Sequence, residues 1–323
     1  MSIFDEQIAR KPNHYPWTKD FIKAMHDGQW SDSEFTFVSD KQDFKVSMTE
    51  EERGIIMRTL SAIGQIEIDV KKFWARLGEN LPHPSLYDLG ITMANIEVIH
   101  NNAYERLLEE LDLNHIFENN LNEDVVKGRV NYLKKHNHKY YKDSKKQYIY
   151  ALALFTLFVE NVSLFSQFYI VLWFERYRNV LKDTAQQVNY TKREEDIHAK
   201  VGIKLINTIR QEFPDLFDSD LEDKILHEAE QAFVAESKII DWIVDEWSDK
   251  RISAHILKEY VKSRINDSLY QIGFKQIFEI DVNAKRDFEW MDEDTLGNNA
   301  VDFFFQRPTD YVKNIAIDEG DLI

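Results

Sequence analysis

A four-residue pattern, Glu-x-x-His, occurs twice in this chain and constrains its fold more than any other feature. The first copy holds Glu97 and His100, and the second holds Glu195 and His198. Residues three or four apart share one face of a helix, so each pair offers a carboxylate and an imidazole to the same neighbour. One copy alone is common on surface helices. Two copies, with single carboxylates from two further helices, match the ligand set of a dinuclear metal site inside a helical bundle.

The composition fits a large helical domain that binds metal without sulfur. Of the 323 residues, 43% are hydrophobic and only 10 are Gly and 6 Pro, so long helices can fill a substantial core. The net charge of -17 argues against nucleic acid as a partner, because phosphate binding needs a basic surface. There is no cysteine, so thiolate-held zinc and iron–sulfur sites are excluded. Any metal must be held by oxygen and imidazole ligands.

The sequence predicts no membrane role. The N-terminus lacks the basic and then apolar pattern of a signal segment. The most apolar run, residues 148–174, is long enough to cross a bilayer, but polar residues such as Glu160 and Gln167 interrupt it. Such a run is more typical of a buried bundle helix with a polar functional face. We therefore expect a cytoplasmic protein.

Apolar periodicity and helix breakers predict an all-α chain. Residues 1–46 are expected to be largely irregular, and the chain is expected to become irregular again after Gly273 and to end in an acidic, flexible tail. No alternating pattern of useful length indicates a strand. Helices are predicted at about residues 47–77, 84–111, 123–135, 145–182, 184–213, 221–247 and 252–272.

Glu160 and Glu67 are the single carboxylates that would complete the site. Glu160 interrupts an apolar stretch, and no basic residue lies between residues 151 and 172 to pair with it, although a partner from another helix would also satisfy it. Glu67 lies at the edge of an apolar stripe, near Asp69, and with Lys71 it could equally form an ordinary surface pair. The predicted ligands, which suit a pair of Fe or Mn ions, are Glu67, Glu97, His100, Glu160, Glu195 and His198.

These residues resemble the small (beta) subunit of class I ribonucleotide reductase. The likeness spans nearly the whole chain and is most specific in the paired Glu-x-x-His motifs with Glu160 between them. It implies an all-α, ferritin-like helical bundle with additional helices over residues 1–300, including an irregular N-terminal segment. It also implies a homodimer, and a flexible C-terminal tail over residues 301–323 that docks the large (alpha) subunit.

The resemblance also implies roles for individual residues. Tyr104 matches the position at which many family members hold a tyrosyl radical. Trp30, Glu194 and His100 match a hydrogen-bonded relay from the metals to the surface. Tyr311 matches a tail tyrosine that passes the oxidising equivalent towards the large subunit, although Trp30 and Tyr311 could each be simple packing residues. Because ribonucleotide reduction in this family runs on cysteines, that chemistry would occur on the large subunit.

Two positions depart from the commonest family pattern. Glu194 stands where many members have Asp in the relay, and Glu67 stands where many have Asp as the first ligand. Lys71, one turn after Glu67, would hydrogen-bond that carboxylate and attract a small anionic oxidant such as superoxide. This combination resembles the dimanganese subclass, class Id, in which Tyr104 would not be oxidised. Mn/Mn is therefore the favoured metal pair, and the same ligands accept Fe/Fe or Mn/Fe.

Two other functions remain open. A ligand-binding oxidase or monooxygenase of the same fold would use the metal site but would not need Trp30, Tyr311 or the tail. A metal-storage or purely structural helical protein would lose only metal loading on replacement of Glu97 or His198, and this chain is long for a minimal storage bundle.

Overall fold

The computed structural model is helical throughout the part of the chain that it describes. It describes the backbone of residues 2–245, 247, 249 and 252–300, and the side chains of these residues except 67–69 and 292–300. Within these ranges there is no strand. The predicted all-α class is therefore confirmed.

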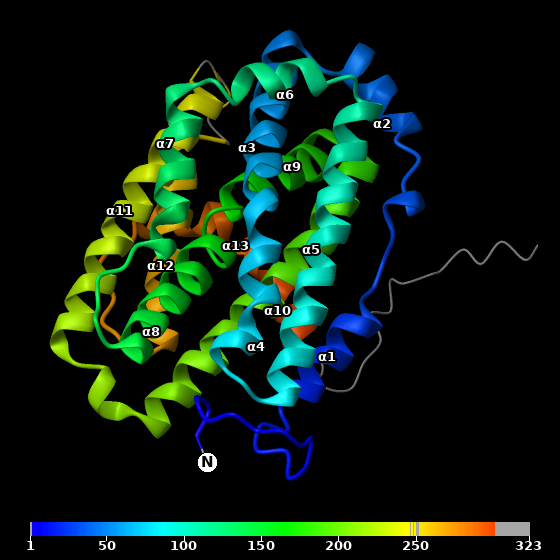
Figure 1. The fold of residues 1–323 in the computed structure, drawn as a ribbon. Coiled ribbons are helices and arrows are strands. Elements are labelled where there is room, and N and C mark those ends of the chain that lie inside the picture. Colours follow the sequence, from blue (N-terminus) through cyan, green and yellow to red (C-terminus); the bar gives the residue numbers. More distant parts are fainter. Residues whose placement is uncertain (1, 246, 248, 250–251, 301–323) are drawn as a thin grey trace, which may run out of the picture.

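Two long helices, α3 (Glu50–Ala75) and α5 (Pro84–Glu110), lie side by side in the bundle (Figure 1). Helix α3 begins with a capping box, in which Thr49 and Glu52 satisfy each other's backbone N–H groups. Helix α5 begins at Pro84, whose missing N–H costs nothing in the first turn. These local signals explain why the sequence predicted both helices within a few residues.

Helix α10 (Lys182–Glu212) packs against α5 and against an apolar rod made of α8 (Ser144–Leu154), the π-helical segment η4 (Phe155–Glu160) and α9 (Phe165–Arg178). The sequence predicted this rod as one helix over 145–182, which is wrong. A π-helical segment and a turn divide it. Because apolar residues cover every side of this buried rod, its hydrophobic pattern has no helical periodicity whose interruption could predict the break.

The break is held by hydrogen bonds that replace the regular helical ladder. The Ser163 N–H and hydroxyl both donate to the Phe158 carbonyl, with donor–acceptor distances of 3.1 and 2.7 Å. Arg129, from another helix, donates to the Ser163 carbonyl, and Arg264 donates to the Asn161 carbonyl at 2.6 Å. The freed backbone groups are thus satisfied partly by the nearby Ser163 and partly by two arginines that lie far away in sequence.

Judged by length and composition only, the rod could cross a membrane. It spans Ser144–Arg178, and 94% of its most apolar window is buried inside the protein. Other helices surround it in Figure 1. The structure therefore confirms that this segment is buried in the core of the protein.

Additional helices cover the bundle. Helix α13 (Val282–Ala300) is held through aromatic contacts, since Phe288 lies 5.2 Å from Tyr260 and Trp290 lies 5.0 Å from Tyr169, measured between ring centroids. The expectation of irregular chain in residues 1–46 and after Gly273 is therefore only partly right, because long-range packing stabilises helices there. The further helices are α1 (Thr18–Asp27), α2 (Val38–Gln42), α4 (Leu77–Asn80), α6 (Asn114–Asn120), α7 (Asp124–Leu133), α11 (Ser219–Val244), α12 (Ala254–Gln271) and α13 (Val282–Ala300).

Candidate metal centre

The two Glu-x-x-His pairs face each other across the core. Glu97 and His100 lie on α5, and Glu195 and His198 lie on α10. Glu160 is the last residue of η4 and joins them from the apolar rod. Each of these five side chains is at most 1% exposed. The structure thus brings together five of the six predicted ligands.

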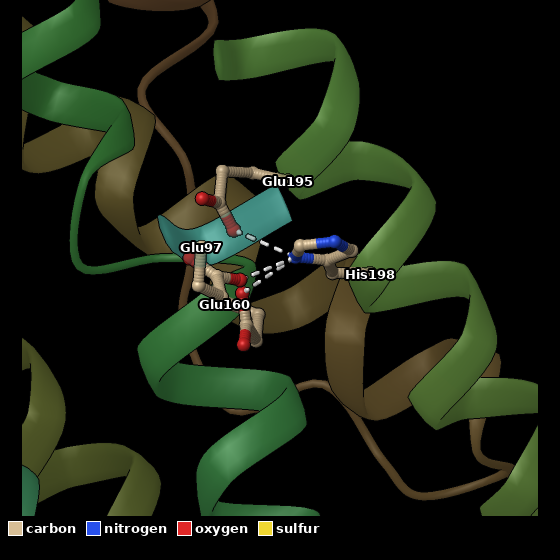
Figure 2. A group of neighbouring side chains, drawn as sticks. All are labelled: Glu97, Glu160, Glu195 and His198. Carbon is tan, nitrogen blue, oxygen red and sulfur yellow. Dashed lines mark ion pairs between the residues drawn. The ribbon is translucent and has the colours of Figure 1, made fainter. Parts of the chain in front are cut away.

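Three carboxylates converge on one imidazole nitrogen, as Figure 2 shows. His198 Nδ1 lies 2.7 Å from Glu97 Oε1, 3.5 Å from Glu195 Oε2 and 3.7 Å from Glu160 Oε2. His100 Nδ1 lies 3.3 Å from Glu97 Oε2 and 3.1 Å from Glu195 Oε1. Glu97 and Glu195 therefore each turn one oxygen towards each histidine, so both carboxylates could help the histidines to hold two ions.

The donor atoms of the cluster fit a metal pair. One ligand atom from each of Glu97, Glu160, Glu195 and His198 lies within 4.8 Å of the others. Both oxygens of Glu97, Oε2 of Glu195 and Nδ1 of His198 are buried and make no hydrogen bond of regular geometry with the described residues, although Glu97 Oε1 and His198 Nδ1 lie only 2.7 Å apart. Three buried carboxylates gathered around two imidazoles are costly, and divalent cations would neutralise their charge. Oxygen and imidazole donors suit Fe and Mn, so the chemistry of these residues fits a dinuclear metal site.

The close packing of carboxylates and imidazoles shifts their pKa values. Burial, reinforced by the neighbouring Glu195, raises the pKa of Glu160 well above its usual range. Burial also disfavours charged imidazoles, but contacts with the surrounding carboxylates outweigh it and raise the pKa values of His100 and His198 well above 6.5. The cluster thus attracts positive charge strongly.

Trp74 is a partner of the site that sequence reasoning missed. It lies on α3, and its indole Nε1 donates to Glu160 Oε1 at 2.6 Å. This bond leaves Oε2 of Glu160 directed towards His198. The sequence could have indicated a hydrogen bond from Trp74, because a buried tryptophan usually finds an acceptor for its N–H. Its position in the apolar stripe of α3 indicated only packing.

The residues of the expected relay lie in a continuous chain of hydrogen bonds. Trp30 Nε1 donates to Glu194 Oε2 at 2.8 Å, and the same oxygen lies 2.8 Å from His100 Nε2. Trp30 and Glu194 are each 4% exposed. The longer side chain of Glu194, which replaces the commoner Asp, thus still reaches both neighbours.

Tyr104 and Lys71 lie close to the ligands in sequence and in space. Tyr104 is buried on α5, one turn beyond His100. Lys71 Nζ donates to Asn101 Oδ1 at 3.0 Å, and Asn101 Nδ2 donates to the Glu97 carbonyl at 2.7 Å. The predicted ligand Glu67 belongs to α3, but its side chain lies outside the described part of the structure, as do the side chain of Asp69 and the whole of Tyr311.

Comparisons with known proteins show the family of this chain. The family model for the ribonucleotide reductase small chain matches residues 7–285. The ribonucleoside-diphosphate reductase subunit beta of Chlamydia pneumoniae is 24% identical over 313 residues, covering 93% of this chain and 88% of the relative. That of Halalkalibacterium halodurans is 22% identical over 314 residues, covering 95% and 88%.

Solved structures show the same ferritin-like helical bundle. The ribonucleotide reductase R2 subunit from Clostridium botulinum superposes with a TM-score of 0.79 at 18% identity, covering 90% of this chain and 93% of that chain. An R2-like ligand-binding oxidase with a Mn/Fe cofactor gives a TM-score of 0.69 at 19% identity, covering 83% and 97%. The fold alone therefore fits both kinds of protein, whereas the family model, which spans most of the sequence, shows that this chain belongs to the ribonucleotide reductase small chain family.

Proposed function

We propose that this chain is the radical-generating small subunit of a class I ribonucleotide reductase. Its oxidised dinuclear centre supplies a one-electron oxidant to a cysteine of the large subunit, where ribonucleotides are reduced to deoxyribonucleotides. The observation that carries the proposal is the chain of hydrogen bonds from His100 through Glu194 to Trp30. A subunit that exports an oxidising equivalent needs such a path out of a buried site.

The residues around the site have two tasks. They hold the metal pair, and they exclude water. When bound, the metal pair supplies the redox equivalent. Glu97, Glu160, Glu195, His100 and His198 hold it, with Glu67 proposed as the sixth ligand. The burial of the first five side chains keeps water from the site.

Trp30 and Glu194 carry out the first step of the export on the protein side. An indole that gives up an electron becomes a stronger acid at its N–H. Glu194 Oε2, 2.8 Å from Trp30 Nε1, is placed to accept that proton or to share it. Charge therefore does not accumulate on the buried ring during electron transfer.

We further propose a Mn/Mn pair, with Tyr104 present but not oxidised. The support is Lys71, whose ammonium is held by Asn101 beside the ligand helix and favours the approach of an anionic oxidant. Metal analysis and electron paramagnetic resonance of the activated protein test this. Manganese without a tyrosyl signal is expected, whereas a tyrosyl signal beside iron would contradict it.

The proposal includes a set of partners and a place in the cell. The protein is a cytoplasmic homodimer that acts only with the large subunit and binds neither nucleic acid nor membrane. Residues 301–323 form the docking tail, Tyr311 passes the oxidising equivalent across the interface, and the bundle ends near residue 300.

A ligand-binding oxidase is the second candidate, since such proteins share the fold with TM-scores near 0.69. Removal of residues 301–323 separates the two functions. We expect the full chain to support ribonucleotide reduction with its cognate large subunit, and the truncated chain to retain two metal ions per protomer but lose that activity. Full activity without the tail would overturn the docking proposal. A metal-loaded full chain that is inactive with its large subunit would favour the oxidase.

A further inference from the structure

An arginine outside the metal site connects the two chain segments that carry Glu160 and Glu195. Arg264 lies on α12, and its Nε donates to the Asn161 carbonyl at 2.6 Å while its Nη2 donates to Asn161 Oδ1. The same Nη2 lies 3.3 Å from Asp196 Oδ1. Asn161 directly follows Glu160, and Asp196 directly follows Glu195. One guanidinium therefore binds the immediate neighbour of each of these two ligands.

The contact lies where the backbone most needs support. Residue 161 begins the break between η4 and α9, so its carbonyl has no regular helical partner. The guanidinium lies over the Phe165 ring, with Cζ 3.3 Å from the ring centroid, and only 12% of the Arg264 side chain is exposed. Stacking and the planar fork of donors hold it in one orientation, which a lysine could not reproduce.

Helix α12 also holds the break from a second residue. Ser268, one turn after Arg264, accepts a hydrogen bond from Asn161 Nδ2 at 2.5 Å and donates to the Leu157 carbonyl at 3.3 Å. The segment that carries Glu160 is thus fixed to α12 on both sides of that ligand. Through Asp196, α12 is fixed to α10 as well.

We propose that Arg264 is a positioning residue of the dinuclear centre, which sets the separation between Glu160 and Glu195 from outside the ligand shell. The proposal rests on the metal-binding role stated above. Without Arg264, the break would relax and Glu160 would be presented to the metals in several orientations. The expected consequence is weaker and less uniform metal binding in a protein that still folds.

The test compares Arg264→Met and Arg264→Lys with Arg210→Met. Arg210 is a matched control, because it also connects α10 with the end of α12, through the Ile272 carbonyl, and stacks over Phe274. It lies three turns beyond His198, away from the ligands. The readouts are the number of Mn(II) ions per chain, their affinity in competition with a chelator, and the rise in Tm on adding Mn(II) to the metal-free protein.

Both Arg264 variants are expected to lower the affinity for Mn(II) by about tenfold, the lower end of the effect of losing an outer-shell contact, and to reduce the metal-induced rise in Tm. Arg210→Met is expected to lower the Tm of both forms equally and to leave the affinity unchanged. If a folded Arg264 variant binds Mn(II) as tightly as wild type, the inference about Arg264 is overturned. The proposed function is not affected by that result.

Should Arg264→Met fail to fold, Arg264→Lys and Asn161→Ala decide the matter by the same readouts. Asn161→Ala removes the Oδ1 acceptor but keeps the carbonyl, so it is expected to show the same direction of change. If wild-type protein itself binds no metal pair, the proposed function fails and this inference fails with it.

Discussion

The indole of Trp74 donates a hydrogen bond to a carboxylate oxygen of Glu160, with Trp74 Nε1 2.6 Å from Glu160 Oε1 and both side chains buried. In Trp74→Phe the ring volume is largely kept but the donor is lost. We expect the affinity for the metal pair to fall about 10- to 100-fold, as is typical when an outer-shell hydrogen bond is removed. Chelator competition measures this.

Trp173→Phe is the control for that variant. Trp173 is also fully buried, but it packs on α9 against Phe174 and Trp247. It should lose stability without losing metal affinity. Equal affinity in Trp74→Phe and wild type would show that Glu160 is oriented without the indole.

Trp30→Phe should separate metal binding from export of the oxidising equivalent. The variant keeps an aromatic ring next to Phe35 but loses the donor to Glu194. Activity with the large subunit is expected to fall to background, while metal content stays at the wild-type level. Trp17→Phe, at a half-buried tryptophan on the outside, should keep full activity. Retained activity in Trp30→Phe would remove Trp30 from the path.

Gly202 permits the close approach of α10 to η4. A Cβ at this position would lie 2.1 Å from Thr156 Oγ1 and 2.7 Å from Thr156 Cβ. Gly202 lies one turn after His198, and Thr156 lies one turn before Glu160. Gly202→Ala should therefore destabilise the fold by about 1–3 kcal/mol through overpacking and weaken metal binding. Denaturant unfolding and chelator competition measure the two effects.

Two companion variants test the cause. Gly202→Ala combined with Thr156→Gly removes the clash and should restore metal affinity. Gly128→Ala, on α7 where a Cβ would meet nothing within 4 Å, should stabilise the protein by about 0.5–1 kcal/mol through helix propensity. Stabilisation by Gly202→Ala as well would contradict the expected clash.

Glu228 should make stability depend on pH below its ordinary pKa of 4.5. Burial acts to raise this pKa, but hydrogen bonds from Lys135 and Lys224 outweigh burial and lower it. Because the folded pKa is the lower one, the unfolded state binds more protons as the pH falls from 4.5 towards the folded pKa. The stabilisation is therefore complete at neutral pH and is lost on acidification through that window.

Glu228→Gln should accordingly be less stable than wild type by about 1.5–3 kcal/mol at pH 7, a typical value for hydrogen bonds to a charged group. The difference should shrink as the pH falls below 4.5. Urea unfolding across this range measures it. Glu230→Gln, at an exposed position of the same helix, should stay close to wild type at every pH. A constant difference for Glu228→Gln would contradict the assigned ion pairs.

Local spacing in the sequence was enough to predict four of the candidate ligand side chains that meet in the core. Glu97 with His100, and Glu195 with His198, are each one helical turn apart, so a correct helix assignment already fixes a shared face. Glu160 could be predicted by contrast, because an acid inside an apolar run needs a partner. Helix starts at Thr49 and Pro84 likewise depend on adjacent residues, and they were predicted closely.

Contacts between distant segments could not be predicted in this way. Trp74 and Arg264 act on Glu160 and on its neighbour from other helices, and nothing in their own surroundings in the sequence marks them. The break after Glu160 depends on Arg129 and Arg264, so local periodicity indicated one continuous helix. Helix α13 was missed because its stability comes from aromatic contacts with α9 and α12.

The apolar rod over Ser144–Arg178 has a consequence for synthesis of the chain. Its cover includes α10, α11 and α12, all of which follow it in sequence. While the ribosome is still adding those helices, the most apolar segment of the protein lacks the helices that bury it. Nascent chains that stop soon after residue 181 should therefore aggregate or bind chaperones, although the same segment is buried away from water in the completed protein.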